Sequence, residues 1–299
     1  MPNKTERKRE RKDVPGLHSM RVSLQKILIA QSNGDALPRR VRVEVRDLVL
    51  DPDYQRRTSM YRAKNIARNW VQALCDDIVV AHRDGAFFVV DGGHRVFAMR
   101  IKKIKTCWAK VLVHSTQTKE AVFFAARGTS TQKLKPADIY HCAVTAKEPI
   151  ACGIQAILDD FKLIIPRAGG SSSYAPNHIF CVNLIEKIWI YDSGNLLRHI
   201  IEILTRAWDD AARLRKHLFA GLFTLFTDAR WMENGFSLVD SERLIATLSK
   251  RGPLSIISTA NSIKITGGIP LGLAAALAIL TQYNKQLRSK RLVNPLTDG

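Results

Sequence analysis

An apolar strand that runs directly into two glycines is the feature that most constrains the fold. Phe87-Phe88-Val89-Val90 is followed by Asp91-Gly92-Gly93-His94-Arg95, and the pattern predicts a helix from Val96 to Ile101. Upstream, a strand at Ile78–Val80 is joined to it through Asp84-Gly85, a pair typical of hairpin turns. Short strands and helices in this order predict an α/β unit with a small mixed sheet.

The five residues Asp91–Arg95 carry a chemical prediction as well as a structural one. A helix that starts directly after a strand leaves backbone N–H groups unpaired, and its dipole favours an anion there. The two glycines let the backbone turn sharply and approach a ligand closely. His94 and Arg95 add donors, and arginine suits bidentate contact with phosphate. The motif predicts a phosphate-binding turn; the alternative is an ordinary strand–turn–helix with an exposed His and Arg.

The pattern along the chain predicts three regions. They are a basic tail with a lead-in helix over 1–38, an α/β unit over 39–147 and a mostly helical region over 148–299. The α/β elements are expected at Arg39–Val45, Tyr61–Leu74, Ile78–Val80, Phe87–Val90, Val96–Ile101, Cys107–Val113, Thr118–Arg127 and Pro136–Ala146. The later helices are expected at Ala151–Phe161, Phe180–Ile190, Asn195–Leu218, Ser241–Lys250 and Leu273–Leu287. The helical region is either a second domain or an extension packed on the first.

The charge balance points to a polyanionic partner. The 299 residues include 46 Lys and Arg against 27 Asp and Glu, a net charge of +19. Such self-repulsion is usual in proteins that bind nucleic acid, and the alternative is an inert charged surface.

The longest apolar run, Ile269–Leu280, is shorter than the ~20 residues of a membrane-spanning helix. The chain starts without the apolar segment of a signal peptide. Five cysteines without a C-x-x-C pair predict buried thiols in a reducing compartment, so we expect a cytoplasmic protein with no membrane partner.

Three segments, in order, resemble the ParB/sulfiredoxin-like superfamily. Leu48–Arg56 is similar to its "L-x-P-N-P-x-Q-x-R" segment, and Val89–Ala98 resembles the "DG-x-HR-xx-A" variant of its central box. Arg127–Ile139, which contains Leu134-Lys135-Pro136, resembles the following "ENxQRxxLxPxEEA" box. The resemblance covers about residues 40–147. It implies a small α/β fold that binds a nucleotide or phosphate, with CTP or ATP and Mg²⁺ as cofactors and DNA as a partner.

The same resemblance assigns residues to the nucleotide site. It implies that Gln55 and Arg56 lie near the base or phosphates, that Gly92, Gly93, His94 and Arg95 form the phosphate loop, and that Thr129, Ser130, Thr131 and Gln132 close the site. Two departures matter. Arg127 and Gly128 replace the Glu and Asn of the third box, which argues against nucleotide hydrolysis of the ParB kind. Gly93 stands where a sulfiredoxin carries its nucleophilic Cys, which excludes sulfinic-acid reduction.

The layout of the whole chain resembles uncharacterised ParB-like proteins of phages and prophages. There, a DG-x-HR domain precedes a helical region with a Trp near the end of a long helix, here Trp208, and a Tyr-Asn near the C-terminus, here Tyr283-Asn284.

Candidate DNA contacts lie in the helical region. Ser241–Lys250 and Leu254–Ile263 flank Arg251-Gly252-Pro253, a pattern that fits either a helix-turn-helix or any helical hairpin. The residues predicted to contact DNA phosphates are Lys250, Arg251, Lys264, Lys285, Arg288, Lys290 and Arg291.

The leading hypothesis is therefore a nucleotide- or phosphate-binding protein that binds DNA. The alternative is a nuclease or nucleotide-dependent phosphotransferase in which Asp91 and His94 are the catalytic pair. A third interpretation is an interaction protein with a vestigial pocket. No metal site is predicted, because His and Cys residues do not repeat at ligand spacing. The pattern leaves a homodimer open.

Overall fold

A computed structural model describes residues 20, 24, 38–112, 115–127, 134–167, 177–233, 236–285, 287 and 292–293. Its first half is built on a five-stranded mixed sheet in the order β1-β5-β3-β4-β2. The strands are β1 (Arg39–Glu44), β2 (Leu48–Val49), β3 (Ile78–Arg83), β4 (Ala86–Asp91) and β5 (Thr106–Leu112), and the helices that follow or separate them are α2 (Met60–Arg68), α3 (Gly93–Ile101) and α4 (Gln117–Arg127).

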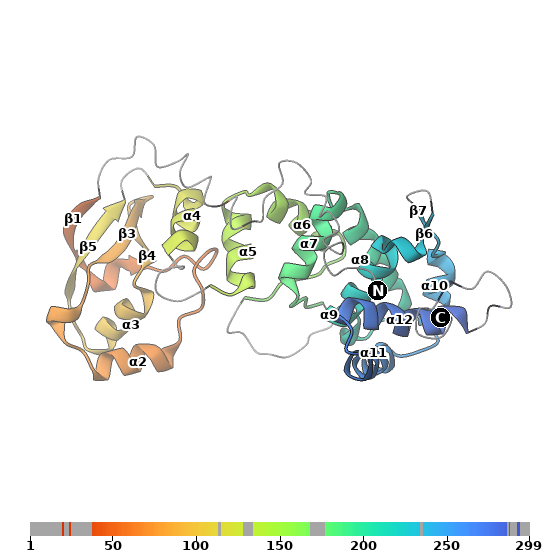
Figure 1. Cartoon of the computed structure of the whole chain (residues 1–299). Helices are drawn as coiled ribbons and strands as arrows, with labels where there is room; N and C mark the ends of the chain where they lie inside the picture. The colour runs from red at the N-terminus through yellow and green to blue at the C-terminus, as the bar shows by residue number, and fades with distance from the viewer. Residues whose placement is uncertain are drawn as a thin grey trace, which may run out of the picture.

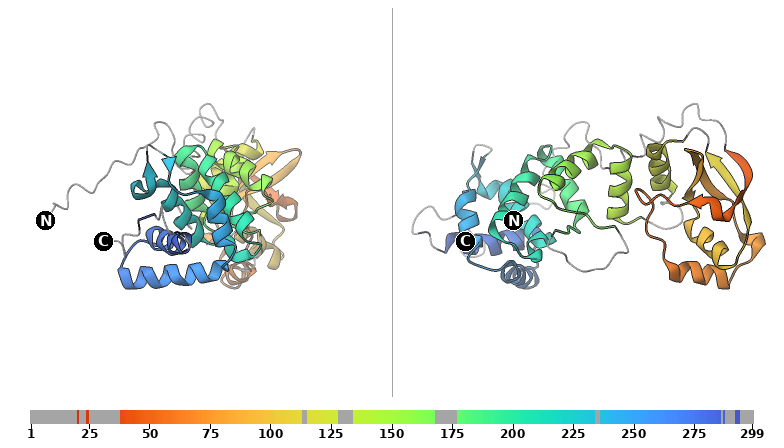
Figure 2. Two further views of the ribbon diagram at one scale, coloured as in Figure 1. Left: turned by 90° about the vertical axis from the view of Figure 1, so that its right-hand side faces the viewer. Right: turned by 180° about the vertical axis from the view of Figure 1, so that it is seen from behind.

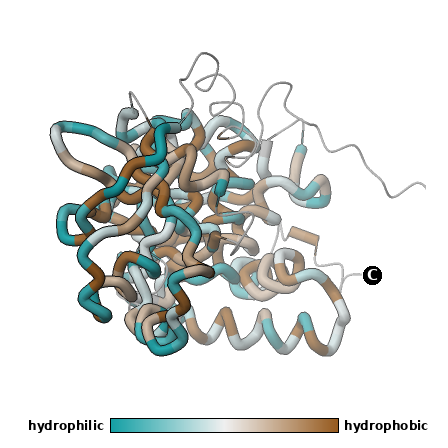
Figure 3. Tube along the Cα trace, turned by 90° about the vertical axis from the view of Figure 1, so that its left-hand side faces the viewer, coloured by the Kyte–Doolittle hydropathy of each residue, from teal (hydrophilic) through white to brown (hydrophobic). Residues whose placement is uncertain are grey.

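Alternation along the strands decides what each face of the sheet contacts. Along β5, Cys107, Ala109 and Val111 are buried while Trp108 and Lys110 are exposed, as a period of two residues requires. The buried face packs on α3 through Val96 and Met99. On the opposite face, the β3 and β4 end of the sheet packs against apolar residues of α4. Figure 3 is viewed from the end of the molecule that carries the sheet, and it shows hydrophilic and hydrophobic residues alternating along the chain there.

The second half of the described chain is helical. Its α-helices are α5 (Pro136–Thr145), α6 (Pro149–Asp160), α7 (Val182–Asp192), α8 (Asn195–Ala207), α9 (Lys216–Thr227), α10 (Ser241–Leu248), α11 (Pro253–Gly267) and α12 (Leu271–Asn284). The molecule is elongated, with the sheet at one end, the α9–α12 helices at the other, and α5 and α6 between them (Figures 1 and 2). The predicted α/β unit followed by a helical region is confirmed.

One apolar core runs from the sheet into the helical half. It joins residues of β3 and β4 to α4, α5 and α6 and continues to α12. Met20 and Leu24 belong to the same core, and the Met20 backbone N–H donates to the Glu186 carboxylate at 2.8 Å. Since no gap in the core separates the two halves, the division at residues 147 and 148 stays a prediction.

Two expected helices end six or more residues earlier than their patterns predict. The helix expected over Tyr61–Leu74 ends at Arg68, and Val71 and Leu74 are 53% and 80% exposed instead of sharing a buried face. Asn69 ends it, because its side-chain amide donates to the Asn65 carbonyl, as short polar side chains do at helix ends. The helix expected over Asn195–Leu218 is broken after Ala207, where Trp208 takes an extended conformation.

Candidate functional site

The corner between β4 and α3 has the geometry that its two glycines predict. Gly92 lies in the left-handed region with φ of 102°, which side chains rarely adopt. A Cβ placed on Gly92 would lie 2.6 Å from the Ile78 Cδ1 atom. A Cβ on Gly93 would lie 3.2 Å from the Leu50 Cδ2 atom. Gly92 is therefore required for the chain to turn directly from the strand into the helix, whereas a side chain at Gly93 would need only a small shift of Leu50.

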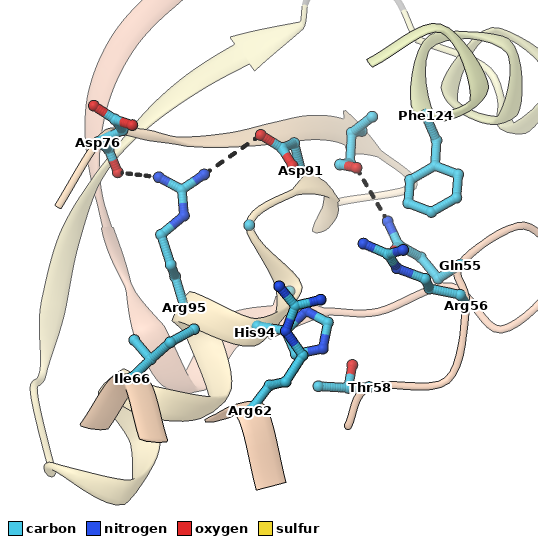
Figure 4. Close-up of a pocket in the computed structure, with 13 residues that line it drawn as sticks. Gln55, Arg56, Thr58, Arg62, Ile66, Asp76, Asp91, His94, Arg95 and Phe124 are labelled. Atoms are coloured by element: carbon cyan, nitrogen blue, oxygen red, sulfur yellow. Dashed lines mark hydrogen bonds and ion pairs between the residues drawn. The ribbon is translucent and has the colours of Figure 1, made fainter. Parts of the chain in front are cut away.

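This corner opens into a pocket of about 320 Å³ (Figure 4). The pocket is lined by Gln55, Arg56, Thr58, Arg62, Ile66, Asp76, Val90, Asp91, Gly92, Gly93, His94, Arg95 and Phe124. The structure thus brings together all six nucleotide-site residues that fall within its described part. Thr129, Ser130, Thr131 and Gln132 lie outside the described residues. A cavity of this size is in the range of small-ligand sites.

Arg95 is held at the wall of the pocket by Asp76, Asp77 and Asp91. Its Nη1 donates to the Asp76 backbone carbonyl at 2.7 Å, and its Nη2 lies 3.4 Å from the Asp91 Oδ2 atom. Arg127, from the end of α4, approaches the same Asp91 oxygen at 3.3 Å. The Asp91 carboxylate is therefore shared by two guanidinium groups. Of the two acidic residues that line the pocket, Asp76 and Asp91, the second is thus already paired with arginines and is less suited to hold Mg²⁺.

His94 faces a different set of groups. Its Nε2 accepts a hydrogen bond from the Ser59 backbone N–H at 3.3 Å, which places the ring proton on Nδ1. Burial, and then the charges of Arg62 and Arg56, lower the pKa of His94 below its ordinary value. The imidazole is therefore neutral at neutral pH. Among the described residues no hydrogen bond joins Asp91 to His94, and their role as a catalytic pair stays a prediction.

Gln55 has a structural duty in this pocket. Its side chain is buried, and the amide Nε2 donates to the Val89 carbonyl at 2.6 Å and to the Val90 carbonyl at 3.2 Å. It thus ties the Leu48–Arg56 segment to the end of β4 beside Gly92. Both hydrogens of the Gln55 amide nitrogen are donated to backbone carbonyls. The contact of Gln55 with a base, which the resemblance implies, would therefore involve the Oε1 atom alone.

Arg56 and Arg62 make the end of the pocket near His94 strongly basic. Arg56 makes no hydrogen bond or ion pair with any described residue, and its guanidinium lies near the Gln55 side chain in Figure 4. Arg62 comes from the first turn of α2, and its guanidinium lies beside the His94 ring (Figure 4). The motifs did not indicate Arg62 or Phe124. The one sequence feature that could have pointed to Arg62 is the cluster of basic residues Arg56, Arg57 and Arg62.

A buried polar cluster supports the loop that carries Gln55. The Arg83 guanidinium lies 2.7 Å from the Asp51 carboxylate and 3.1 Å from the Glu120 carboxylate, which is fully buried. The Tyr54 hydroxyl donates to Glu120 at 3.0 Å, and burial and this carboxylate raise the pKa of Tyr54 well above its usual range. Arg83 also lies over the Phe88 ring at 4.0 Å. These contacts join residues far apart in the sequence, which no local pattern indicates.

The predicted DNA contacts are described in part. Lys250 and Arg251 are exposed in the turn between α10 and α11, and Lys264 is exposed about 17 Å further along the α11 axis. The Trp208 indole N–H donates to the Leu248 and Arg251 carbonyls at 3.0 and 2.6 Å, which fixes this turn. Lys285 follows α12, whereas Arg288, Lys290 and Arg291 lie outside the described residues.

Other side chains set further limits. Cys107 and Cys142 are buried, Cys75, Cys152 and Cys181 are half-buried, and all five are free thiols. Within the described ranges no three His, Cys, Asp or Glu side chains group as metal ligands, and no helix is long and apolar enough to cross a membrane.

Similar solved structures are ParB proteins at low identity. One is ParB from Caulobacter crescentus complexed with CTP-γ-S, with 12% identity, a TM-score of 0.27, and coverage of 80% of this chain and 92% of that one. A second is the same protein complexed with the centromeric parS site, with 14% identity, a TM-score of 0.30, and coverage of 80% and 98%. A third is a pNOB8-like ParB N-domain, with 11% identity, a TM-score of 0.31, and coverage of 85% and 94%. At these scores no residue or ligand is carried over.

A family model gives a firmer placement than these structures. No curated protein sequence matches the chain. The model of a family of unknown function, DUF6551, matches residues 50–294, which include the β4–α3 corner, the pocket and the helical half. The chain therefore belongs to the DUF6551 family of unknown function.

Proposed function

We propose that the pocket at the β4–α3 corner binds a phosphate-bearing ligand, with a nucleotide as its class, and that the helical half binds DNA. The carrying observation is the basic lining of the pocket, where Arg56, Arg62 and Arg95 meet the start of α3. Among the described residues, the backbone N–H groups of Gly93, His94 and Arg95 have no acceptor, as expected for the first turn of a helix.

The lining favours an anion over a cation. The Asp91 charge is already balanced by Arg95 and Arg127, and Arg56 adds positive charge next to the amide donors at the start of α3. Guanidinium groups and the N-terminus of a helix together form a strong phosphate site. The neutral His94 ring offers its Nδ1–H as a further donor. The buried Phe124 provides an apolar wall for a base or sugar.

The test is a binding panel of CTP, ATP and GTP, with and without Mg²⁺, measured by calorimetry. Arg56→Gln keeps much of the side-chain volume but removes the charge, and we expect it to weaken binding about tenfold, since a charge-assisted hydrogen bond contributes ~1.5–3 kcal/mol. Arg57→Gln is the matched control, because Arg57 is the adjacent, exposed residue outside the pocket lining. Equal affinities for the two variants, or no nucleotide bound by the wild type, would contradict the proposal.

The DNA part of the proposal rests on the turn between α10 and α11. Lys250 and Arg251 are exposed there, and α11 runs along the outer edge of the helical half (Figure 2). Its exposed side includes the polar residues Ser255, Ser258, Asn261 and Ser262 together with Lys264. An exposed helix with hydroxyl, amide and ammonium groups suits contact with a DNA groove and its phosphates.

Salt dependence of duplex binding tests this part. We expect Arg251→Ala to weaken binding across duplex sequences and to reduce the slope of log K against log salt by about one, the change for one lost phosphate contact. Lys102→Ala, an exposed lysine at the end of α3, is the control for general charge. An unchanged slope in Arg251→Ala counts against the helical half as the duplex site.

Two further parts of the proposal rest on the sequence alone, namely a phage or prophage origin and a homodimer. The layout with Trp208 and Tyr283-Asn284 supports a phage or prophage origin. A homodimer is tested by light scattering of the full chain with and without nucleotide and duplex. A mass of one chain, 33.6 kDa, under all conditions would contradict it.

A further inference from the structure

The outer face of the β1–β5 pair carries an exposed aromatic ring among cations, and its residues Arg40, Arg42, Trp108 and Lys110 do not line the pocket at the β4–α3 corner. In the antiparallel register Arg42 lies opposite Trp108 and Arg40 lies opposite Lys110. All four side chains point away from the buried face, and Trp108 is 46% exposed. Figure 1 shows β1 and β5 at the end of the molecule opposite the helical half.

These four residues include a pairing that normally destabilises a β-sheet. Like charges directly opposite each other on a strand pair are destabilising, yet Arg40 and Lys110 are paired in this way. Arg40 is compensated by the Asp77 carboxylate, at 2.9 Å, and lies 4.3 Å over the Trp108 ring. Lys110 has no ion pair among the described residues. Residues that break a local rule without full compensation are often functional.

The contacts around Trp108 hold its ring in an orientation that suits stacking with a flat group. The Arg40 guanidinium covers one side of the indole and is itself fixed by two hydrogen bonds to Asp77. Arg42 is fixed by its Nε, which donates to the Thr106 hydroxyl at 2.8 Å and leaves its terminal nitrogens available. A ring and two cations already held in place lose little conformational entropy on binding.

We propose that this face, the Arg40–Arg42–Trp108–Lys110 block, binds single-stranded nucleic acid. An unpaired base stacks on the Trp108 ring, and the flanking phosphates contact Arg42 and Lys110. Charge complementarity decides between partners: three cations of the block face one paired carboxylate, Asp77, with Glu44 two residues beyond Arg42 on the same strand face. An acidic peptide would satisfy the cations but not the ring, because the face of an indole carries partial negative charge. A duplex offers no free base to stack.

The test uses the full chain and a fluorescein-labelled deoxythymidine 20-mer, with anisotropy as the readout. Trp108→Ala should weaken binding about tenfold, the usual effect of losing one base stack, while Trp108→Phe should retain most of the affinity. The Phe variant keeps the proposal falsifiable if the Ala variant is poorly folded. Binding of a duplex of equal length should be the same in wild type and in both variants.

Charge is tested separately with a matched pair. Lys110→Glu and Lys102→Glu change the net charge equally, but only the first lies in the block. We expect Lys110→Glu to weaken binding of the 20-mer at least about fivefold more than Lys102→Glu, since the contact is local.

Three results would overturn the proposal. They are unchanged affinity for the 20-mer in Trp108→Ala, equal losses in the two Lys→Glu variants, and a polyglutamate peptide that binds with the same dependence on Trp108. Arg251→Ala, which tests the duplex site, should leave binding of the 20-mer unchanged. The two proposals therefore fail separately.

Discussion

Among single residues, Gly92 decides whether the pocket exists. Its φ of 102° lets β4 pass straight into α3 and directs the first amides of the helix toward the pocket. Two costs would follow from any side chain there, one from the backbone conformation and one from the contact with Ile78. Gly85, in the β3–β4 turn, also has a positive φ, 75°, but no atom lies within 4 Å of its added Cβ.

Comparing Gly85 with Gly92 separates the cost of a left-handed backbone conformation from the cost of the contact with Ile78. We expect Gly85→Ala to destabilise the protein by about 1 kcal/mol, the cost of a left-handed non-glycine residue, and Gly92→Ala by about 2–4 kcal/mol, because overpacking adds to it. Urea unfolding of the two variants measures the difference. Equal losses of unfolding free energy would mean that the Ile78 contact relaxes freely.

His94 predicts how stability depends on pH. Its folded-state pKa is lowered below 6.5, so the unfolded chain binds a proton more readily than the folded protein. Stability is therefore fully present above about pH 6.5, falls as the pH falls through that value, and stops falling below the folded-state pKa. His94→Gln cannot take up this proton.

The unfolding free energy of wild type should therefore drop relative to His94→Gln between about pH 7.5 and pH 5. Burial also lowers the pKa of His141, but His141 is present in both proteins, so its contribution to the pH dependence cancels in the comparison. A difference that stays constant, or that grows in favour of wild type at low pH, would show that His94 is not held neutral.

Among the helices and turns, Trp208 explains both a wrong prediction and a fixed turn. Apolar periodicity predicted one helix over Asn195–Leu218, but the chain leaves the helix after Ala207 and Asp210 caps a new 3-10 turn. The break lets the Trp208 indole reach the carbonyls of Leu248 and Arg251. A tertiary contact thus outweighs the local helical preference.

Trp208→Phe removes this donor and leaves two carbonyls without it. We expect a loss of about 1–3 kcal/mol in unfolding free energy and weaker duplex binding, with nucleotide binding unchanged. Trp70→Phe is the control, because the Trp70 N–H donates to the exposed Gln72 side chain and its loss should cost under about 0.5 kcal/mol. Equal effects of the two changes would argue against a special role for the turn.

Across the full length of the protein, the helical half holds the loop that builds the pocket. Arg167, which follows α6, donates to the Asp53 carbonyl at 2.6 Å and to the Gln55 carbonyl at 3.4 Å. From α5, the Thr145 hydroxyl donates to the same Asp53 carbonyl at 3.2 Å. Gln55 in turn holds the end of β4, so packing of the helical half sets the position of the pocket wall.

Arg167→Ala should therefore weaken nucleotide binding about fivefold, the value of roughly one net hydrogen bond, although Arg167 lies outside the pocket lining. Duplex binding should not change. Arg198→Ala, which removes an exposed ion pair with Asp160, is the control and should leave both affinities unaltered. Nucleotide affinity in Arg167→Ala equal to wild type would mean that the loop keeps its position without the helical half.

Local patterns in the sequence were enough to predict most of the strands and helices, the sharp glycine turn between β4 and α3, and the α10–α11 turn, because alternation, helical period and turn residues act between near neighbours. They missed the short strand β2 and merged α8 and α9 into one helix. The side chains that surround the corner followed only from the folded chain. Packing brought Arg62 and Phe124 into the pocket, paired Asp91 with Arg127, and turned the Gln55 amide onto the β4 backbone. Contacts between distant segments depend on how whole faces pack, and no local pattern carries that information.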